Sequence, residues 1–133
     1  MPDAVSTQTI LDGERLVIQK FTNLSDGTGE TNVPKIIPAN LARNAFGQAC
    51  TTVKINKITF STHGLEVLIR FGGATPGYAF MLPQNMSYCL DFSGFGGITN
   101  NATTPTGTVT FTTDDHSSGD GYTVIIEAIK VYG

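Results

Sequence analysis

The stretch Leu65-Glu66-Val67-Leu68-Ile69-Arg70-Phe71 indicates the fold class. Apolar residues occupy every second position of this stretch, and two of the positions between them are charged. Successive side chains of a β-strand point to opposite faces, so the pattern predicts a strand with one buried face and one face mostly in water. The same period recurs at Met86, Tyr88, Leu90 and Phe92, and again at Val109 and Phe111, which alternate with threonines.

The C-terminal segment 122–132 is apolar on both faces of a predicted strand. One face carries Tyr122, Val124, Ile126 and Ala128, and the other carries Ile125, Ile129 and Val131. Strands that are buried on both sides have near-continuous apolar sequences. We therefore expect a central strand here, or a strand whose second face is covered by a partner.

The segment 51–62 changes the phase of its alternation. Val53 and Ile55 share one face, whereas Ile58 and Phe60 fall on the other. One extra residue in a strand produces such a shift. We therefore expect a β-bulge near Asn56-Lys57, or a strand that passes from one sheet to another.

Shorter apolar runs and turn signals complete the predicted fold. Further strands are expected at 7–10, 15–24, 33–37 and 78–82, and one or two helical turns within 39–46. His63-Gly64 is the best candidate for a hairpin turn, because glycine tolerates the positive φ of tight turns. One-sided strands must bury their apolar faces against one another. We predict an all-β protein, an antiparallel β-sandwich of eight or nine strands, with one domain over residues 7–133 and an N-terminal arm over residues 1–6.

The composition limits the expected partners. The chain has 133 residues and a formal net charge of -3. It has no lysine and arginine cluster that could neutralise a row of phosphates, so neither nucleic acid nor an anionic membrane is an expected partner. No apolar run approaches the ~20 residues that span a bilayer, and the first residues lack the features of a secretory signal. We expect synthesis in a cytoplasm.

Residues suited to catalysis or metal binding do not form a complete motif. The run from Asp114 to Gly121 contains His116 and several oxygen ligands, but the glutamate that closes a calcium loop is missing. The cluster Ser93-Gly94-Phe95-Gly96-Gly97 lacks the lysine and the following helix of a phosphate-binding loop, so a backbone turn is expected there. We predict no enzyme and no metal or cofactor site.

The two cysteines, Cys50 and Cys89, leave two states open. A disulfide is possible if their Cα atoms lie within about 7 Å of each other. A cytoplasmic origin favours two free and mostly buried thiols.

Several aromatic residues fall in predicted loops or at strand ends, namely Phe46, Tyr78, Phe80, Phe95 and Tyr132. Their default role is to close the ends of the sandwich. Alternatively, some of them are anchors for a neighbouring chain, because aromatic side chains supply contact area at low entropic cost.

Five blocks of the sequence resemble small virion proteins of tailed bacteriophages. The blocks are Gln8 to Arg15, Val53 to Ile58, Gly64 to Ile69, Gly94 to Asn101 and Gly121 to Lys130. Similar chains are jelly rolls that act as capsid decoration, or cement, proteins. The resemblance implies a jelly-roll-like fold without catalytic residues. It also implies a position on the outer surface of an icosahedral virion head, commonly as homotrimers that bridge subunits of the major capsid protein.

Candidate interface residues follow from this resemblance and from the surface pattern. The resemblance implies contacts from the N-terminal arm and from the glycine turn, and closing a trimer would cover the second face of the C-terminal strand. The candidates are Pro2, Asp3, Ala4, Val5, Phe46, Gly94, Phe95, Gly96, Gly97, Ile125, Ile129 and Val131.

Two other binding functions fit the same pattern. A tail or fibre adaptor of the virion could have the same sandwich but would be present in far fewer copies per particle. A carbohydrate-binding module could use exposed aromatic side chains. It is disfavoured because the chain has no tryptophan, the residue best suited to stacking on sugars.

Overall fold

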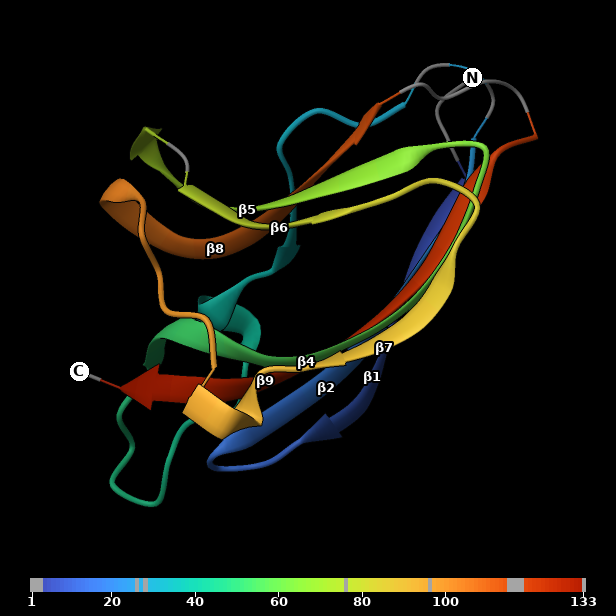
Figure 1. Cartoon of the computed structure of the whole chain (residues 1–133). Coiled ribbons are helices and arrows are strands. Elements are labelled where there is room, and N and C mark those ends of the chain that lie inside the picture. Colours follow the sequence, from blue (N-terminus) through green and yellow to red (C-terminus); the bar gives the residue numbers. More distant parts are fainter. Residues whose placement is uncertain are drawn as a thin grey trace.

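Figure 1 shows the computed structural model, in which two β-sheets face each other. The structure describes residues 4–25, 27, 29–75, 77–95, 97–114 and 119–132. Within these ranges the chain forms two short 3-10 turns, η1 (Pro38–Asn40) and η2 (Ser93–Phe95). The strands are β1 (Ala4–Asp12), β2 (Leu16–Leu24), β3 (Val33–Ile36), β4 (Cys50–His63), β5 (Glu66–Thr75), β6 (Gly77–Leu82), β7 (Ser87–Asp91), β8 (Thr103–Asp114) and β9 (Gly121–Tyr132).

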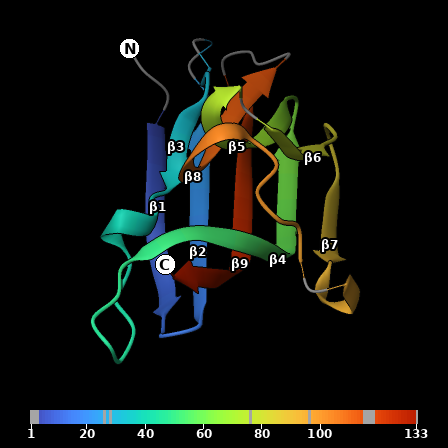
Figure 2. The ribbon, with the colours of Figure 1, turned by 90° about the vertical axis from the view of Figure 1, so that its left-hand side faces the viewer.

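The strands are wound as a jelly roll. One sheet has the order β1-β2-β9-β4-β7 and the other the order β3-β8-β5-β6 (Figure 2). The antiparallel pairs β2·β9, β3·β8, β4·β7 and β5·β6 form one long ribbon, with β2 to β5 as one arm and β6 to β9 as the other. Rolling this ribbon brings β9 beside β4 and β8 beside β5. The predicted all-β, jelly-roll-like sandwich is confirmed, and β1 is an additional strand beside β2.

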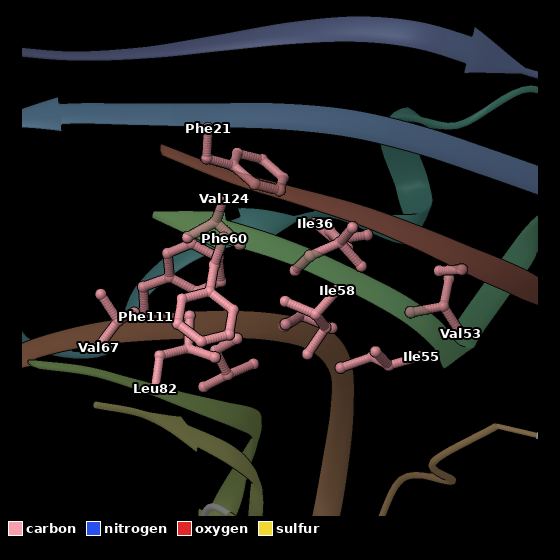
Figure 3. Close-up of a cluster of buried hydrophobic side chains, with 14 of the residues drawn as sticks. Phe21, Ile36, Val53, Ile55, Ile58, Phe60, Val67, Leu82, Phe111 and Val124 are labelled. Atoms are coloured by element: carbon pink, nitrogen blue, oxygen red, sulfur yellow. The ribbon is translucent and has the colours of Figure 1, made fainter. Parts of the chain in front are cut away.

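The hydrophobic core fills the space between the two sheets (Figure 3). Phe21 of β2 meets Phe111 of β8 edge to face, with 5.3 Å between the ring centroids. Such a pair contributes about 0.5–1.5 kcal/mol beyond the burial of its area. The period-two prediction is confirmed, because its four apolar residues are each 0% exposed, namely Leu65, Val67, Ile69 and Phe71.

The phase change in β4 is a β-bulge, as predicted. The register of β4 against β9 shifts between Ile55 and Lys57, so Asn56 is the extra residue. Ile55 and Ile58 are therefore both 0% exposed and both face the core. The central position of β9, between β2 and β4, is also confirmed.

The hairpin predicted at His63-Gly64 is wrong. Gly64 has the expected positive φ, +77°, but the turn joins β4 of one sheet to β5 of the other. The partners of β4 are β7 and β9, and those of β5 are β6 and β8. A tight turn is specified by local residues, whereas the pairing of the strands around it depends on distant ones.

The alternation from Met86 to Phe92 does not mark a fully buried face. Met86 is 48% exposed and Tyr88 is 62% exposed. Both belong to the region of β7, which is an edge strand of its sheet. Only the later part of the pattern, Leu90 and Phe92, packs against the core.

The N-terminal boundary is also corrected. Residues 4–6 were expected in an arm, but β1 begins at Ala4 and pairs Ala4, Val5 and Ser6 with residues 24, 23 and 22 of β2. Backbone pairing with β2, and not burial, therefore places these residues in a strand, since residues 5–11 of β1 are all exposed. In the region 39–46, expected to contain one or two helical turns, the structure has the single 3-10 turn η1.

Candidate interface

The predicted interface residues do not form one patch. Val5 lies opposite Asn23, which pairs with Tyr122 near the start of β9. Val131, by contrast, lies at the end of β9 and pairs with Thr52. Of the remaining candidates, Pro2, Asp3 and Gly96 lie outside the described residues, and Ala4 and Phe95 are described only as backbone.

The outer face of the five-stranded sheet differs from one end to the other. Toward the Val5 end, hydroxyl side chains lie side by side across the strands, and Ser87 Oγ donates to Ser61 Oγ at 3.0 Å. This row consists of Ser6, Thr22, Thr123, Ser61 and Ser87. Toward the Val131 end, Ile129 pairs with Leu16. The apolar part of this face therefore lies at the end where β9 finishes.

Ile125, Ile129 and Val131 were expected on a second face of β9 that is buried or covered. They lie on the outer face of the sheet and are half-buried. Ile125 sits between Lys20 of β2 and Thr59 of β4, so polar neighbours interrupt the apolar surface. The face is amphipathic and is not a continuous hydrophobic patch.

Phe46 is the most exposed of the large hydrophobic side chains in the described residues, at 88%. It lies in the loop 42–49, and Asn44 organises this loop. Asn44 Oδ1 accepts hydrogen bonds from the backbone N–H groups of Phe46 and Gln48, each at 3.0 Å. Asn44 Nδ2 also donates to Gln48 Oε1 at 2.8 Å. The loop therefore holds its backbone in one conformation while it presents a phenyl ring to solvent.

Ionic contacts fix this loop to the sheet. The N–H of Ala42 donates to Asp12 Oδ2 at 3.0 Å, and the N–H of Ala45 donates to Glu14 Oε1 at 3.1 Å. The side chain of Lys130, which is 0% exposed, forms an ion pair with Asp12 and donates to the carbonyl of Ala42 at 3.1 Å. The β1–β2 turn and β9 together anchor the base of the loop. In Figure 2 the loop projects at the lower end of the sandwich.

Three other aromatic residues that were candidates for an anchor have partners within the chain. The guanidinium of Arg70 lies 4.4 Å from the ring centroid of Tyr78, and Phe80 packs against Phe92 with 5.6 Å between centroids. The hydroxyl of Tyr132 donates to the carbonyl of Glu14. Phe80 and Tyr132 are half-buried, as their default role of closing the sandwich predicts, whereas Tyr78 is 46% exposed and Phe46 is 88% exposed.

The glycine cluster forms the expected backbone turn where it is described. Asp91 Oδ1 accepts from the N–H of Ser93 at 2.9 Å at the start of η2. The hydroxyl and then the N–H of Ser93 lower the pKa of the Asp91 carboxyl. Gly97 packs so closely on β4 that a Cβ atom there would lie 3.0 Å from the carbonyl oxygen of Ile55. Gly94, in contrast, has open space around it.

Both cysteines are free. Cys50 is buried, and desolvation raises the pKa of its thiol. Cys89 is exposed on β7, which corrects the expectation that both thiols are mostly buried.

Groups suited to catalysis do not converge in the part of the chain that the structure describes. No cluster of three or more histidine, cysteine, aspartate or glutamate residues there could hold a metal ion. A pocket of about 520 Å³ lies between η1, the start of β4 and β8, and its lining includes Pro38, Thr52 and Asn100 but no carboxylate or imidazole. Residues 115–118 of the possible calcium run, including His116, lie outside the described residues.

Comparison with known proteins does not assign the chain to a family. No family model matches the chain, and no curated protein matches it. Within the described ranges, no helix is long and apolar enough to cross a membrane.

Proposed function

We propose that this chain is a decoration protein that binds the outer surface of a bacteriophage head and bridges subunits of the major capsid protein. Two lines of argument support the proposal. The sequence blocks resemble such proteins, and the jelly-roll topology is the fold that this resemblance implies. The observation that carries the proposal is Phe46, 88% exposed on a loop that its own hydrogen bonds hold in place.

A rigid exposed aromatic ring suits a binding anchor. Burying a phenylalanine side chain in a pocket of a partner contributes about 1.5–3 kcal/mol from the apolar area removed from water. A loop that is ordered before binding loses little further conformational entropy when it docks. The candidate docking end of the molecule is therefore the one that carries Phe46, with Ile129 and Val131 on the adjoining outer face.

Reinforcement of the head follows from mass action. If the protein binds the assembled shell and not its dissociated subunits, each occupied site stabilises the shell. The gain reaches about 4 kcal/mol per site at a free concentration a thousand times Kd. This role needs no catalytic group, only a folded module with a durable binding surface.

The test uses heads of the phage that encodes this protein. They are assembled by a mutant phage from which the gene for the protein has been deleted, so they lack it. Purified protein is added, and binding is measured by co-sedimentation and head stability by the temperature at which DNA is released. We expect binding at many copies per head and a higher release temperature. Phe46→Ser should weaken binding about 30-fold. Met81→Ser, which removes a side chain 56% exposed on β6, is the matched control and should bind normally.

Two results would contradict the proposal. The first is heads that fail to bind the protein, or that release DNA at an unchanged temperature when fully occupied. The second is a copy number of only a few per particle, which would favour a tail or fibre adaptor.

A further inference from the structure

β1 is a sheet edge whose first part, Ala4 to Thr9, is chemically unprotected, and a register shift and the charged Asp12 follow that part. From Ala4 to Leu11 it contains no charged residue and no proline. Val5 is 49% exposed, Ile10 is 51% exposed and Leu11 is 44% exposed. Edge strands expose unpaired N–H and C=O groups, and soluble proteins usually protect them with charges, prolines or short length. β1 has none of these protections before the register shift between Thr9 and Leu11.

Two of the other three sheet edges carry such features. β3 contains Pro34, which has no N–H to donate. β7 has only 5 residues and ends in Asp91, whose lowered pKa keeps it ionised. β6 has no charge and no proline, but it has only 6 residues, and the side-chain amide of Asn101 donates to the carbonyl of Tyr78 at 3.2 Å. Of the four edges, β1 therefore has the longest uncharged run, from Ala4 to Leu11.

The inner side of β1 also lacks a cover. Val5, Thr7 and Thr9 lie opposite Asn23, Phe21 and Gln19 of β2, which are buried beneath the other sheet. Val5, Thr7 and Thr9 themselves are exposed. Figure 2 shows β1 at the outer edge of the five-stranded sheet. The sheet therefore extends one strand beyond the part that the four-stranded sheet covers.

From these features we infer that β1 pairs antiparallel with β1 of a second copy of this chain, across a twofold axis at Thr7. In such a pair Val5 lies opposite Thr9, Ser6 lies opposite Gln8 and Thr7 lies opposite its own copy. None of these residues is charged, so self-pairing brings no like charges together. Centring the pair on Thr7 keeps residues 5–9 of both copies within the regular run and sets Thr7 opposite its own symmetry mate. Facing threonines are a favourable cross-strand pair.

This contact produces a closed dimer and no larger assembly. The opposite edge of the same sheet is β7, which has a different sequence and the charged Asp91. A twofold contact joins the same patch on both copies and does not propagate. The inference goes beyond the proposed function, and it replaces the threefold association that the resemblance implies with a twofold one.

The experiment measures molar mass against concentration by sedimentation equilibrium on the full chain. The wild-type protein should be a dimer. Thr7→Lys and Thr7→Glu each place like charges opposite one another and remove the threonine pair, so each should raise the dimer dissociation constant about tenfold. An equimolar mixture of the two variants should restore dimers, because opposite charges then face each other.

Ser87→Lys is the matched control, since Ser87 is an exposed residue on the other edge of the same sheet and its replacement should leave the dimer intact. Circular dichroism verifies that each variant is folded, and recovery of dimers in the mixture does so independently. A wild-type monomer at every concentration, a trimer, a dimer insensitive to both Thr7 changes, or a mixture that stays monomeric would overturn the inference. None of these results depends on head binding, so they are distinct from a failure of the proposed function.

Discussion

Nζ of Lys35 lies 2.6 Å from Oε2 of Glu30, and the two side chains are each 5% exposed. The other carboxylate oxygen of Glu30 accepts from the hydroxyl of Tyr122 at 2.6 Å and from Nδ2 of Asn23 at 2.9 Å. Asn23 and Tyr122 belong to the five-stranded sheet and Lys35 to the four-stranded one. A buried ion pair with its hydrogen bonds therefore connects the two layers of the sandwich.

Replacing one member of this pair should be costly. Lys35→Met leaves the Glu30 carboxylate buried without its counter-charge, and we expect a loss of about 3–5 kcal/mol in the free energy of unfolding. Urea denaturation at pH 7 measures it. The double variant Glu30→Gln/Lys35→Met removes both charges and should recover most of the loss. Equal losses in the single and double variants would show that the uncompensated charge is not the cause.

The ion pair at the base of the Phe46 loop gives a second stability prediction. Asp12→Ala leaves the ammonium group of Lys130 without its counter-charge. Because Asp12 is itself 26% exposed, water compensates in part, and we expect about 2–3 kcal/mol. The control is Lys57→Ala, which breaks the exposed 4.0 Å pair with Asp91 and should cost clearly less, because exposed ion pairs contribute little to stability. Similar losses in both variants would argue against the anchoring role.

Phe46 should contribute nothing to the stability of the isolated protein. Its ring is 88% exposed, so Phe46→Ser should change the free energy of unfolding by no more than about 0.5 kcal/mol. Thermal and urea unfolding of the purified variant measure this. A large destabilisation would mean that the ring packs within the molecule. Weaker head binding by the same variant would then reflect unfolding of the protein and not the loss of a binding anchor.

The cysteines should differ in reactivity. Iodoacetamide reacts with the thiolate, and Cys50 combines burial with a raised pKa, whereas Cys89 is exposed. At pH 8 the native protein should take up one equivalent, at Cys89, and urea-unfolded protein should take up two. Peptide mass mapping identifies the site. Rapid native labelling of Cys50 would contradict its burial.

Features set by neighbouring residues were predictable from the sequence. The alternation from Leu65 to Phe71 requires only that one side of a strand be buried. The bulge at Asn56 was visible because apolar residues on both sides of it must face the same core. Each of these inferences uses a few consecutive positions and no knowledge of the strand partners.

Features set by distant residues were not predictable in this way. His63-Gly64 specifies a turn, but residues far along the chain decide that β4 and β5 lie in different sheets. Phe46 was an interface candidate because it is aromatic. Its exposure could not be predicted, because it depends on the loop conformation that the hydrogen bonds of Asn44 stabilise. The pair of Glu30 and Lys35 was missed entirely, since a buried charge leaves no periodic signal.

The nested strand order has a consequence for synthesis. β9 lies between β2 and β4 in the five-stranded sheet, so the C-terminal strand of the sandwich joins its N-terminal strands to the rest of the sheet. Until β9 has been synthesised, β2 and β4 each lack the strand that pairs with one of their edges. Such long-range closure makes folding slow, and a chain cut short before residue 121 would leave the β9-facing edges of β2 and β4 unpaired.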